Sequence, residues 1–360
     1  MGCSPGPLKD ILRKVRNKER LSFEDGLSLF MSTDILAVGR MAQEVRERMH
    51  GRRAFYAVNL HLNPTNICST RCEFCAFSRD AGAPDAYALT IDEIEGKVRE
   101  AIRRYCINEV HIVGGHNPSF GLDYYLEMVR RIRQVSAEIF IKAFSAPEVD
   151  FMAKRSKLSW AEVLHRLKVA GLDGMPGGGA EIFDPGVRAR ICPKKISGEE
   201  WLQIHRSAHV AGIQTNATML YGHVETDEQR VAHLLKLREL QDETHGFNAF
   251  VPLAYNPGHN ALKGVKETSG FLDLKVLSIS RLLLDNIPHI KAHGSATDLK
   301  FVQVALSFGA DDIGGTNLHE RVLREAGSRA SEGLSSDDLI RCIRDAGFEP
   351  CLVDSSYSIQ

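Results

Sequence analysis

Short runs rich in β-branched and aromatic residues alternate with longer segments whose apolar residues recur at helical spacing, from residue 55 onward. The short runs predict eight β-strands, over 56–62, 109–113, 139–144, 172–182, 213–220, 247–254, 289–293 and 312–315. The segments between and after them predict helices over 90–104, 122–132, 160–169, 199–211, 226–243, 272–284, 299–308 and 320–326. In the first of these, Thr90 and Glu93 have the spacing of a capping box, which marks where the helix begins.

Strands and helices that alternate in this way require parallel strands joined by right-handed crossovers. Eight such units favour an α/β fold of the (β/α)8 TIM-barrel type, with a partly open barrel of about six units as the alternative. We expect an N-terminal helical extension over residues 1–50, the α/β barrel over 51–330, and a C-terminal cap of the same domain over 331–360. In either barrel, the loops at the carboxyl ends of the strands carry the functional site.

The composition is that of an ordinary globular protein, with 43% hydrophobic and 25% charged residues, which excludes a disordered chain. The formal net charge is −1 and no long block of one sign occurs, so nothing favours a nucleic acid or a membrane surface as partner. No apolar stretch has the length of a membrane span, and the N-terminus has no secretory signal. We therefore expect a cytoplasmic protein that acts on a small molecule.

Three of the eight cysteines, Cys68, Cys72 and Cys75, stand directly after the first predicted strand with the spacing C-x3-C-x2-C. Three thiolates this close would repel one another and oxidise readily unless a metal neutralised them. Structural zinc normally takes four protein ligands, and no fourth Cys or His follows at the usual pair spacing, which disfavours zinc. A four-iron cluster held by only three thiolates has one iron open to an external ligand. The spacing therefore favours an iron–sulfur cluster that takes part in chemistry.

This loop resembles the signature of the radical S-adenosylmethionine (SAM) superfamily, whose C-x3-C-x2-C motif follows the first strand of an α/β barrel. Phe74, directly before the last cysteine, agrees with that signature. The resemblance implies that Cys68, Cys72 and Cys75 hold a [4Fe-4S] cluster whose open iron binds SAM. It also implies a low-potential electron donor, reductive cleavage of SAM to methionine and a 5′-deoxyadenosyl radical, and a place near the adenine for Phe77.

Several other residues are candidates for binding SAM or the substrate. Gly114 and Gly115 end the second predicted strand, at the position of the family's second SAM-binding element, and Glu181 follows a run of three glycines that predicts a tight turn. Alternation along the predicted strands places polar side chains on one face, where they would line a ligand cavity and hold carboxylates. These substrate-binding candidates are Asn59, His61, Asn216, His289, Lys291 and His293.

Six longer runs resemble one branch of the superfamily, the aminofutalosine synthases of the futalosine route to menaquinone; they cover 63–68, 177–183, 216–223, 237–244, 285–292 and 303–312. The resemblance implies that the deoxyadenosyl radical adds to the enol ether of 3-[(1-carboxyvinyl)oxy]benzoate, and that the adduct rearranges and loses the acrylate-derived carboxyl group. Such chemistry needs a dry, oriented pocket that recognises two carboxylates.

The loops over 115–120, 254–260 and 291–297 depart from the pattern of that branch, at the face where substrates are chosen. A related activity, of the cyclic dehypoxanthinylfutalosine synthase or deazaflavin synthase group, therefore stays open, and the run 312–316 resembles those relatives equally well. The alternative from a different class is a non-catalytic protein that uses the cysteines as a zinc or redox clip.

Overall fold

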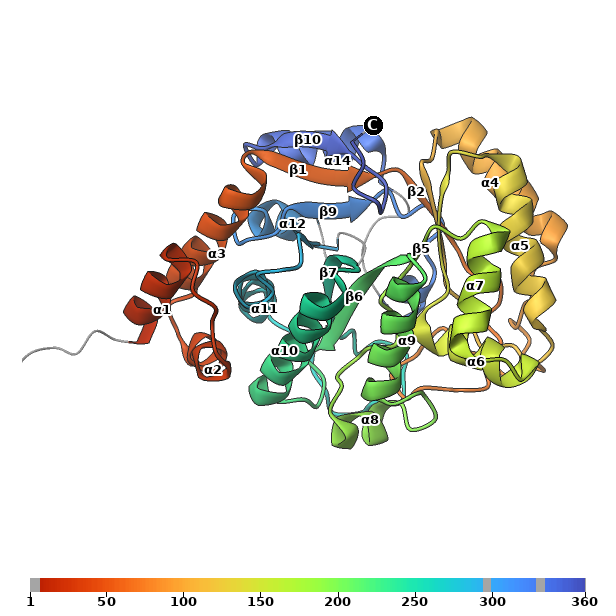
Figure 1. Cartoon of the computed structure of the whole chain (residues 1–360), viewed down its shortest axis with the longest axis horizontal. Coiled ribbons are helices and arrows are strands. Elements are labelled where there is room, and N and C mark those ends of the chain that lie inside the picture. The colour runs from red at the N-terminus through yellow and green to blue at the C-terminus, as the bar shows by residue number, and fades with distance from the viewer. Residues whose placement is uncertain (1–6, 294–298, 328–333, 360) are drawn as a thin grey trace, which may run out of the picture.

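A curled sheet of seven parallel strands forms most of the barrel wall in the computed structural model, which describes residues 7–293, 299–327 and 334–359. The strands neighbour one another in chain order: β2 (Asn59–Leu62), β3 (Glu109–Ile112), β4 (Phe140–Ala143), β5 (Gly174–Met175), β6 (Gln214–Tyr221), β7 (Phe247–Ala254) and β8 (His289–Ile290). Each strand pairs in parallel with the next, from β2 to β8. The crossovers are helical, so the helices cover the outside of the sheet (Figure 1).

A second, three-stranded parallel sheet continues this wall, in the order β10 (Glu349–Leu352), β1 (Arg53–Ala57), β9 (Asp312–Gly315). β1 leads into β2 with only Val58 between them, and Lys291, just after β8, pairs with Asp312 at the start of β9. The Ala292 amide also donates to the Asp312 carbonyl oxygen at 2.7 Å. The wall is thus connected from β2 through β8 and β9 back to β1, which confirms the predicted TIM-type fold.

The helices around the wall are α4 (Ile91–Tyr105), α5 (Leu122–Val135), α6 (Ala146–Ser156), α7 (Trp160–Ala170), α8 (Pro185–Ile191), α9 (Gly198–Val210), α10 (Asp227–Thr244), α11 (Gly270–Leu283), α12 (Leu299–Ala305) and α13 (Val322–Glu325). Thr90 caps α4 as predicted, in a capping box with Glu93. The sequence analysis missed α6, which begins directly after Phe144 and Ser145 at the end of β4, and α8, which has only seven residues.

Two predicted strands differ from the structure. The strand expected over 56–62 is two strands, because the chain changes neighbours at Val58, whose amide and carbonyl both hydrogen-bond to Asn108. The strand expected over 172–182 is only β5, followed by a loop through Gly177 that lies against β6. The Arg188 guanidinium donates to the carbonyl oxygens of Gly179, Ala180 and Ile182, so side-chain donors satisfy backbone groups that a ladder would otherwise pair.

Three helices precede the barrel: α1 (Pro7–Arg16), α2 (Phe23–Met31) and α3 (Ile35–His50). α3 packs along α11, and its buried Arg46 donates to the carbonyl oxygens of Gly51, Arg53 and Ala310. α14 (Ser336–Asp345) leads into β10 at the other end of the chain. The domain boundaries expected at residues 50 and 330 stay a prediction, and positions 294–297 of the divergent loop after β8 lie outside the described residues.

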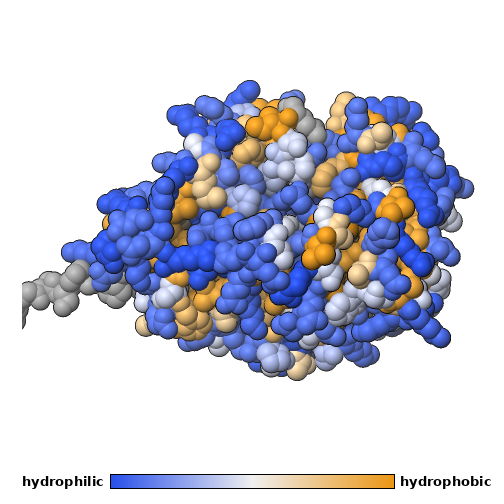
Figure 2. Space-filling view, in the orientation of Figure 1, coloured by the Kyte–Doolittle hydropathy of each residue, from blue (hydrophilic) through white to orange (hydrophobic). Residues whose placement is uncertain are grey.

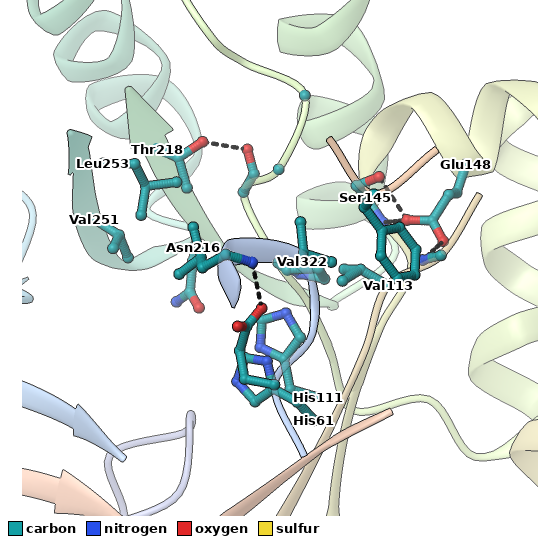
Figure 3. Close-up of a pocket in the computed structure, with 18 of the residues that line it drawn as sticks. His61, His111, Val113, Ser145, Glu148, Asn216, Thr218, Val251, Leu253 and Val322 are labelled. Atoms are coloured by element: carbon teal, nitrogen blue, oxygen red, sulfur yellow. Dashed lines mark hydrogen bonds between the residues drawn. The ribbon is translucent and has the colours of Figure 1, made fainter. Parts of the chain in front are cut away.

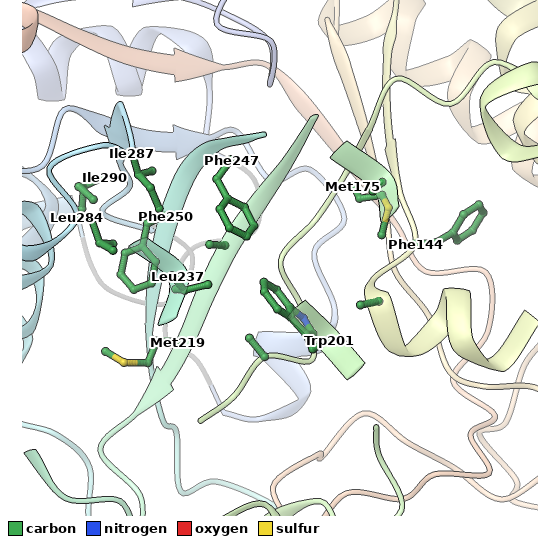
Figure 4. Packing of buried hydrophobic residues seen from close by; sticks show 14 of the residues in the cluster. Phe144, Met175, Trp201, Met219, Leu237, Phe247, Phe250, Leu284, Ile287 and Ile290 are labelled. Atoms are coloured by element: carbon green, nitrogen blue, oxygen red, sulfur yellow. The ribbon is translucent and has the colours of Figure 1, made fainter. Parts of the chain in front are cut away.

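The core lies between the curled sheet and its helices. Trp201 of α9 and Leu237 of α10 pack toward Met219 of β6 and Phe247 and Phe250 of β7, all of which are fully buried (Figure 4). The face of the molecule seen in Figure 2 is mostly hydrophilic, with apolar side chains between the hydrophilic ones. Among the described residues, no helix is both long and apolar enough to cross a membrane.

Candidate active site

The three cysteines of the motif lie on the loop after β2 and line one cavity of about 320 Å³ inside the barrel. Neighbouring segments fix this loop through its backbone. The Cys68 amide donates to the Arg79 carbonyl at 3.0 Å, and the Glu73 amide donates to the Ile191 carbonyl, at the end of α8, at 2.9 Å. The Ser69 amide donates to the His116 carbonyl at 3.0 Å. These hydrogen bonds hold the loop that carries the thiols at the carboxyl end of the barrel.

The arrangement of the thiols fits a cluster better than a single ion. All three are free and partly buried, but within the described residues they do not converge as the atoms of His50, His289 and Asp311 do. A tetrahedral zinc ion would hold its sulfur ligands about 3.8 Å apart. Burial raises the pKa of Cys72 to about 12, although Lys195 opposes the shift. Soft ligands around a shared cavity, with no fourth cysteine among its lining residues, suit a cluster with one open iron.

Gly115 lies flat against the cysteine loop. A Cβ on this residue would lie 2.2 Å from the carbonyl oxygen of Ile67, and its amide donates to the Thr65 carbonyl at 2.9 Å. The close approach at Gly115 is therefore to the cysteine loop, and binding of SAM by Gly114 and Gly115 stays a prediction. The Gly114 amide donates to Glu148 Oε1 at 3.0 Å.

Glu148 is a buried carboxyl group at the start of α6 that the sequence analysis missed. Its Oε2 accepts hydrogen bonds from the amide and the hydroxyl of Ser145, at 2.8 and 2.6 Å (Figure 3). Burial raises the pKa of Glu148 to about 7, although the hydrogen bonds from Ser145 and Gly114 oppose the shift. The carboxyl group thus joins the end of β3 to the beginning of α6.

Glu181 lies in the cavity wall and forms an ion pair with Lys195 Nζ at 2.6 Å. Burial opposes ionisation of Glu181, but the charge and hydrogen bond of Lys195, together with the charge of Arg188, outweigh burial and lower the pKa of Glu181 below its ordinary value. The same ammonium lies 5.1 Å from the centre of the Phe74 ring. Lys195 comes from an irregular loop after α8, where no periodic pattern singled it out. Phe77, also in the wall, is buried with its ring centre 6.4 Å from that of Tyr87.

Polar side chains from neighbouring strands line the deeper part of the cavity. His61 of β2 stacks on His111 of β3 at 4.5 Å between ring centres (Figure 3). Lys142 of β4 pairs with Glu109 of β3 at 2.6 Å. Burial lowers the pKa of His61 to about 3 and that of His111 well below its ordinary value, so both imidazoles are neutral near pH 7. The positive charge in this region therefore comes from lysines; burial lowers the pKa of Lys142, and the carboxylate of Glu109 opposes that shift.

The second lysine is Lys291, whose Nζ lies 3.0 Å from an oxygen of Asp312. Burial disfavours its charge, but Asp312 and Glu109 outweigh burial and raise the pKa of Lys291. Burial lowers the pKa of His293 to about 4. Apolar side chains complete the walls, among them Val113, Val251 and Leu253 (Figure 3).

Of the six predicted substrate-binding candidates, five line this cavity: Asn59, His61, Asn216, Lys291 and His293. The structure does not bring His289 to the cavity. Its Nδ1 lies 2.5 Å from Asp311, and its ring stacks on Tyr357 at 3.4 Å, at the opposite end of the barrel. Glu109, His111 and Lys142 were missed, although the polar residues at alternate positions of β3 are the same signal that identified β2.

Comparison with known proteins agrees with this geometry. Residues 62–237 match the Radical SAM superfamily, and residues 244–360 match the CofH/MqnC C-terminal region. The chain is 44% identical to an aminodeoxyfutalosine synthase of Thermus thermophilus, over 96% of this chain and 94% of the relative. It is 40% identical to a 5-amino-6-(D-ribitylamino)uracil–L-tyrosine 4-hydroxyphenyl transferase of Methanopyrus kandleri, over 88% and 87%.

Among solved structures, methylornithine synthase (PylB) shares the fold, with a TM-score of 0.76 at 17% identity over 96% of this chain and 98% of that one. Enzymes of the superfamily use a [4Fe-4S] cluster and SAM, and a cavity lined by the three thiols fits that pair. With a relative 44% identical over nearly its whole length, this chain belongs to the radical SAM superfamily and is an enzyme of that type.

Proposed function

We propose that this enzyme is an aminodeoxyfutalosine synthase. It would join the adenosyl group of SAM to 3-[(1-carboxyvinyl)oxy]benzoate, with rearrangement onto the ring and loss of the acrylate-derived carboxyl group. The observation that carries the proposal is one continuous cavity with three thiols at one end and two buried lysines in its deeper wall. The 44% identity to a synthase of that name, over nearly the whole chain, supports it.

We assign Cys68, Cys72 and Cys75 as the ligands of the cluster. When bound, the cluster and SAM together supply the 5′-deoxyadenosyl radical. Phe77, Gly114, Gly115 and Glu181 border the space beside the thiols, where SAM would bind.

Glu181 and Lys195 present a carboxylate and an ammonium side by side in that space. The methionine part of SAM carries the complementary pair of charges, an amino and a carboxylate group. We therefore add Lys195 to the residues that would orient SAM.

The deeper part of the cavity suits an aromatic dicarboxylate. Lys142 and Lys291 supply the positive charge, and their buried position strengthens attraction to a carboxylate. The neutral, stacked rings of His61 and His111 and the apolar wall can pack against a benzene ring without adding charge. Such an enclosed site fixes the alkene before reaction and excludes water.

A second candidate function is transfer of a group from L-tyrosine, as the name of the Methanopyrus relative states for that protein. Oε2 of Glu109 is buried without a hydrogen-bond partner, although its carboxylate lines the cavity. An amino-acid substrate has an ammonium group that could donate to this oxygen, whereas the benzoate substrate has none.

One experiment separates the two candidates. The protein is reconstituted with iron and sulfide without oxygen and incubated with SAM and dithionite, either with the enol-ether benzoate or with L-tyrosine and 5-amino-6-(D-ribitylamino)uracil. Mass analysis showing aminodeoxyfutalosine supports the first function, and a hydroxybenzyl adduct of the uracil supports the second. Only 5′-deoxyadenosine and methionine from both mixtures would reject both substrates. Cys72→Ala serves as the control, because it should lose the cluster and all turnover.

A further inference from the structure

The last residues of the chain fold under the barrel, at the end opposite the cysteine loop. After β10 pairs with β1, the Val353 amide donates to the Tyr56 carbonyl at 2.9 Å, and Asn108 donates to the Val353 carbonyl at 3.0 Å. Residues 353–359, the C-terminal tail, then contact residues that begin their strands. Ser355 accepts from Asn248, the second residue of β7, and Tyr357 packs on His289, the first residue of β8.

Ser355 connects the tail to the first cavity lysine. Ser355 is 3% exposed, and its hydroxyl accepts a hydrogen bond from Lys142 Nζ at 2.8 Å. Glu109 accepts from the same ammonium at 2.6 Å. An ammonium has three donors, so these two contacts fix the direction of the third. Ser355 is itself fixed, since its carbonyl accepts from Asn248 Nδ2 at 2.7 Å.

Tyr357 connects the tail to the second cavity lysine through a carboxylate. Its hydroxyl donates to Asp312 Oδ2 at 2.6 Å, and that same oxygen lies 3.0 Å from Lys291 Nζ. The Tyr357 ring lies 5.3 Å from the Lys291 ammonium and stacks in parallel on His289. Tyr357 holds this position with a positive φ of 60°, which a tyrosine adopts only when its contacts outweigh the strain.

We propose that the C-terminal tail is a plug beneath the floor of the cavity and that it positions Lys142 and Lys291 for the carboxylates of the substrate. The inference rests on the proposed function, because it takes the substrate to be a dicarboxylate. Lysine side chains have many rotamers, and an ammonium with no other partner would turn fully toward its own carboxylate. The tail contacts Lys142 directly and Lys291 through Asp312. It thereby holds both ammonium groups in place at the floor of the cavity. Ser355 and Tyr357 are thus positioning residues.

The test uses two substitutions in the reconstituted enzyme, each of which removes one hydroxyl group. Ser355→Ala removes the acceptor for Lys142, and Tyr357→Phe removes the hydroxyl group but keeps the ring on His289. Ser358→Ala, at an exposed position of the same tail, is the matched control. We expect KM for the enol-ether benzoate to rise about tenfold in each of the first two variants, the effect of one lost charge-assisted hydrogen bond.

Measurements on the cluster and SAM, which bind at the other end of the barrel, distinguish loss of lysine positioning from loss of the whole fold. Iron content, SAM binding and the slow cleavage of SAM without substrate should stay at wild-type levels, while the ratio of coupled product to free 5′-deoxyadenosine falls. An unchanged KM and an unchanged product ratio in both variants would overturn the proposal. So would an equal effect in Ser358→Ala.

A measurement on the wild-type protein covers the case in which the variants fold poorly. If the tail positions the lysines, a ligand on the lysines must stabilise the tail in return. Benzene-1,3-dicarboxylate, a simple probe of the same charge, should slow hydrogen exchange in residues 353–359, and benzoate should slow it less. No change in the tail at a concentration that slows exchange in β4 would contradict the plug. If the wild type binds this probe but forms no aminodeoxyfutalosine, the proposed function is wrong. The hydrogen-exchange result still tests the proposed role of the tail in that case.

Discussion

Replacing Gly115 by alanine tests whether the end of β3 sets the position of the cysteine loop. The added Cβ would lie 2.2 Å from the carbonyl oxygen of Ile67, 2.7 Å from its carbonyl carbon and 3.1 Å from Cβ of Cys68. Carbon and oxygen atoms in contact stay about 3.3 Å apart, so the loop must retreat by about 1 Å. Because the nearest atoms are backbone atoms, no change of rotamer can relieve the clash.

Displacement of the cysteine loop should lower the stability of the protein, and it should lower the rate of SAM cleavage even more. Overpacking of this kind destabilises a protein by about 1–3 kcal/mol. The loop cannot move freely, since Cys68 and Glu73 are tied through their amides to Arg79 and Ile191. A displacement of about 1 Å in a reacting assembly lowers rates about 100-fold. We therefore expect Gly115→Ala to retain less iron and to cleave SAM about 100-fold more slowly than the wild type.

The assay measures iron and sulfide per chain after anaerobic reconstitution, the rate of 5′-deoxyadenosine formation, and thermal unfolding. Gly96→Ala on α4 is the control, because a Cβ there meets nothing within 4 Å and an alanine favours the helix. Wild-type iron content and cleavage rate in Gly115→Ala would refute the reasoning. Equal losses in both variants would show that the effect is not the contact with Ile67.

Three further predictions concern buried charges. Since the pKa of Glu148 is raised from 4.5 to about 7, the folded protein holds a proton that the unfolded chain releases, so stability falls by about 3 kcal/mol as pH rises from 4 to 8. Across that pH range the melting temperature of Glu148→Gln should fall less steeply with pH than that of the wild type. An equal slope for the two proteins would contradict this. Asp311→Asn leaves the fully buried Arg281 without its carboxylate and should lower the free energy of unfolding by about 3–5 kcal/mol, measured in urea. Lys142→Met should raise KM for the enol-ether benzoate more than His61→Asn does, because His61 carries no charge near pH 7; equal KM values would argue against recognition by charge.

The cysteine loop and the polar face of β2 could be predicted because their information is local. Three thiols within eight positions and alternating polar residues on one strand do not depend on distant segments. The same alternation in β3 gives Glu109 and His111, and the structure brings these two beside Asn59 and His61 through the parallel register. The sequence alone does not give the register in which the strands pair. That register brings polar residues from separate strands together in one cavity wall.

His289 shows where such reasoning fails. Alternation identifies the face of a strand but not the height along the barrel, and each step of two residues moves a side chain by about 6.6 Å. Lys291 and His293 therefore line the cavity, while His289 lies below it between Asp311 and Tyr357. Lys195 could not have been found, because it reaches Glu181 from an irregular loop after α8.

The two ends of the cavity can carry different parts of the function. Relatives with two different reaction names match nearly the whole chain at 44% and 40% identity, so the cysteine loop that all radical SAM enzymes share cannot decide between their substrates. We expect the choice of substrate to depend on the charged floor of the cavity, which in this chain holds Glu109, Lys142 and Lys291. Each of these three residues lies within the reach of the C-terminal tail or of a residue that the tail contacts. If the tail acts as proposed, a change of substrate would require different charged residues in this floor and a tail that contacts them, while the thiols and the glycine pair stay the same.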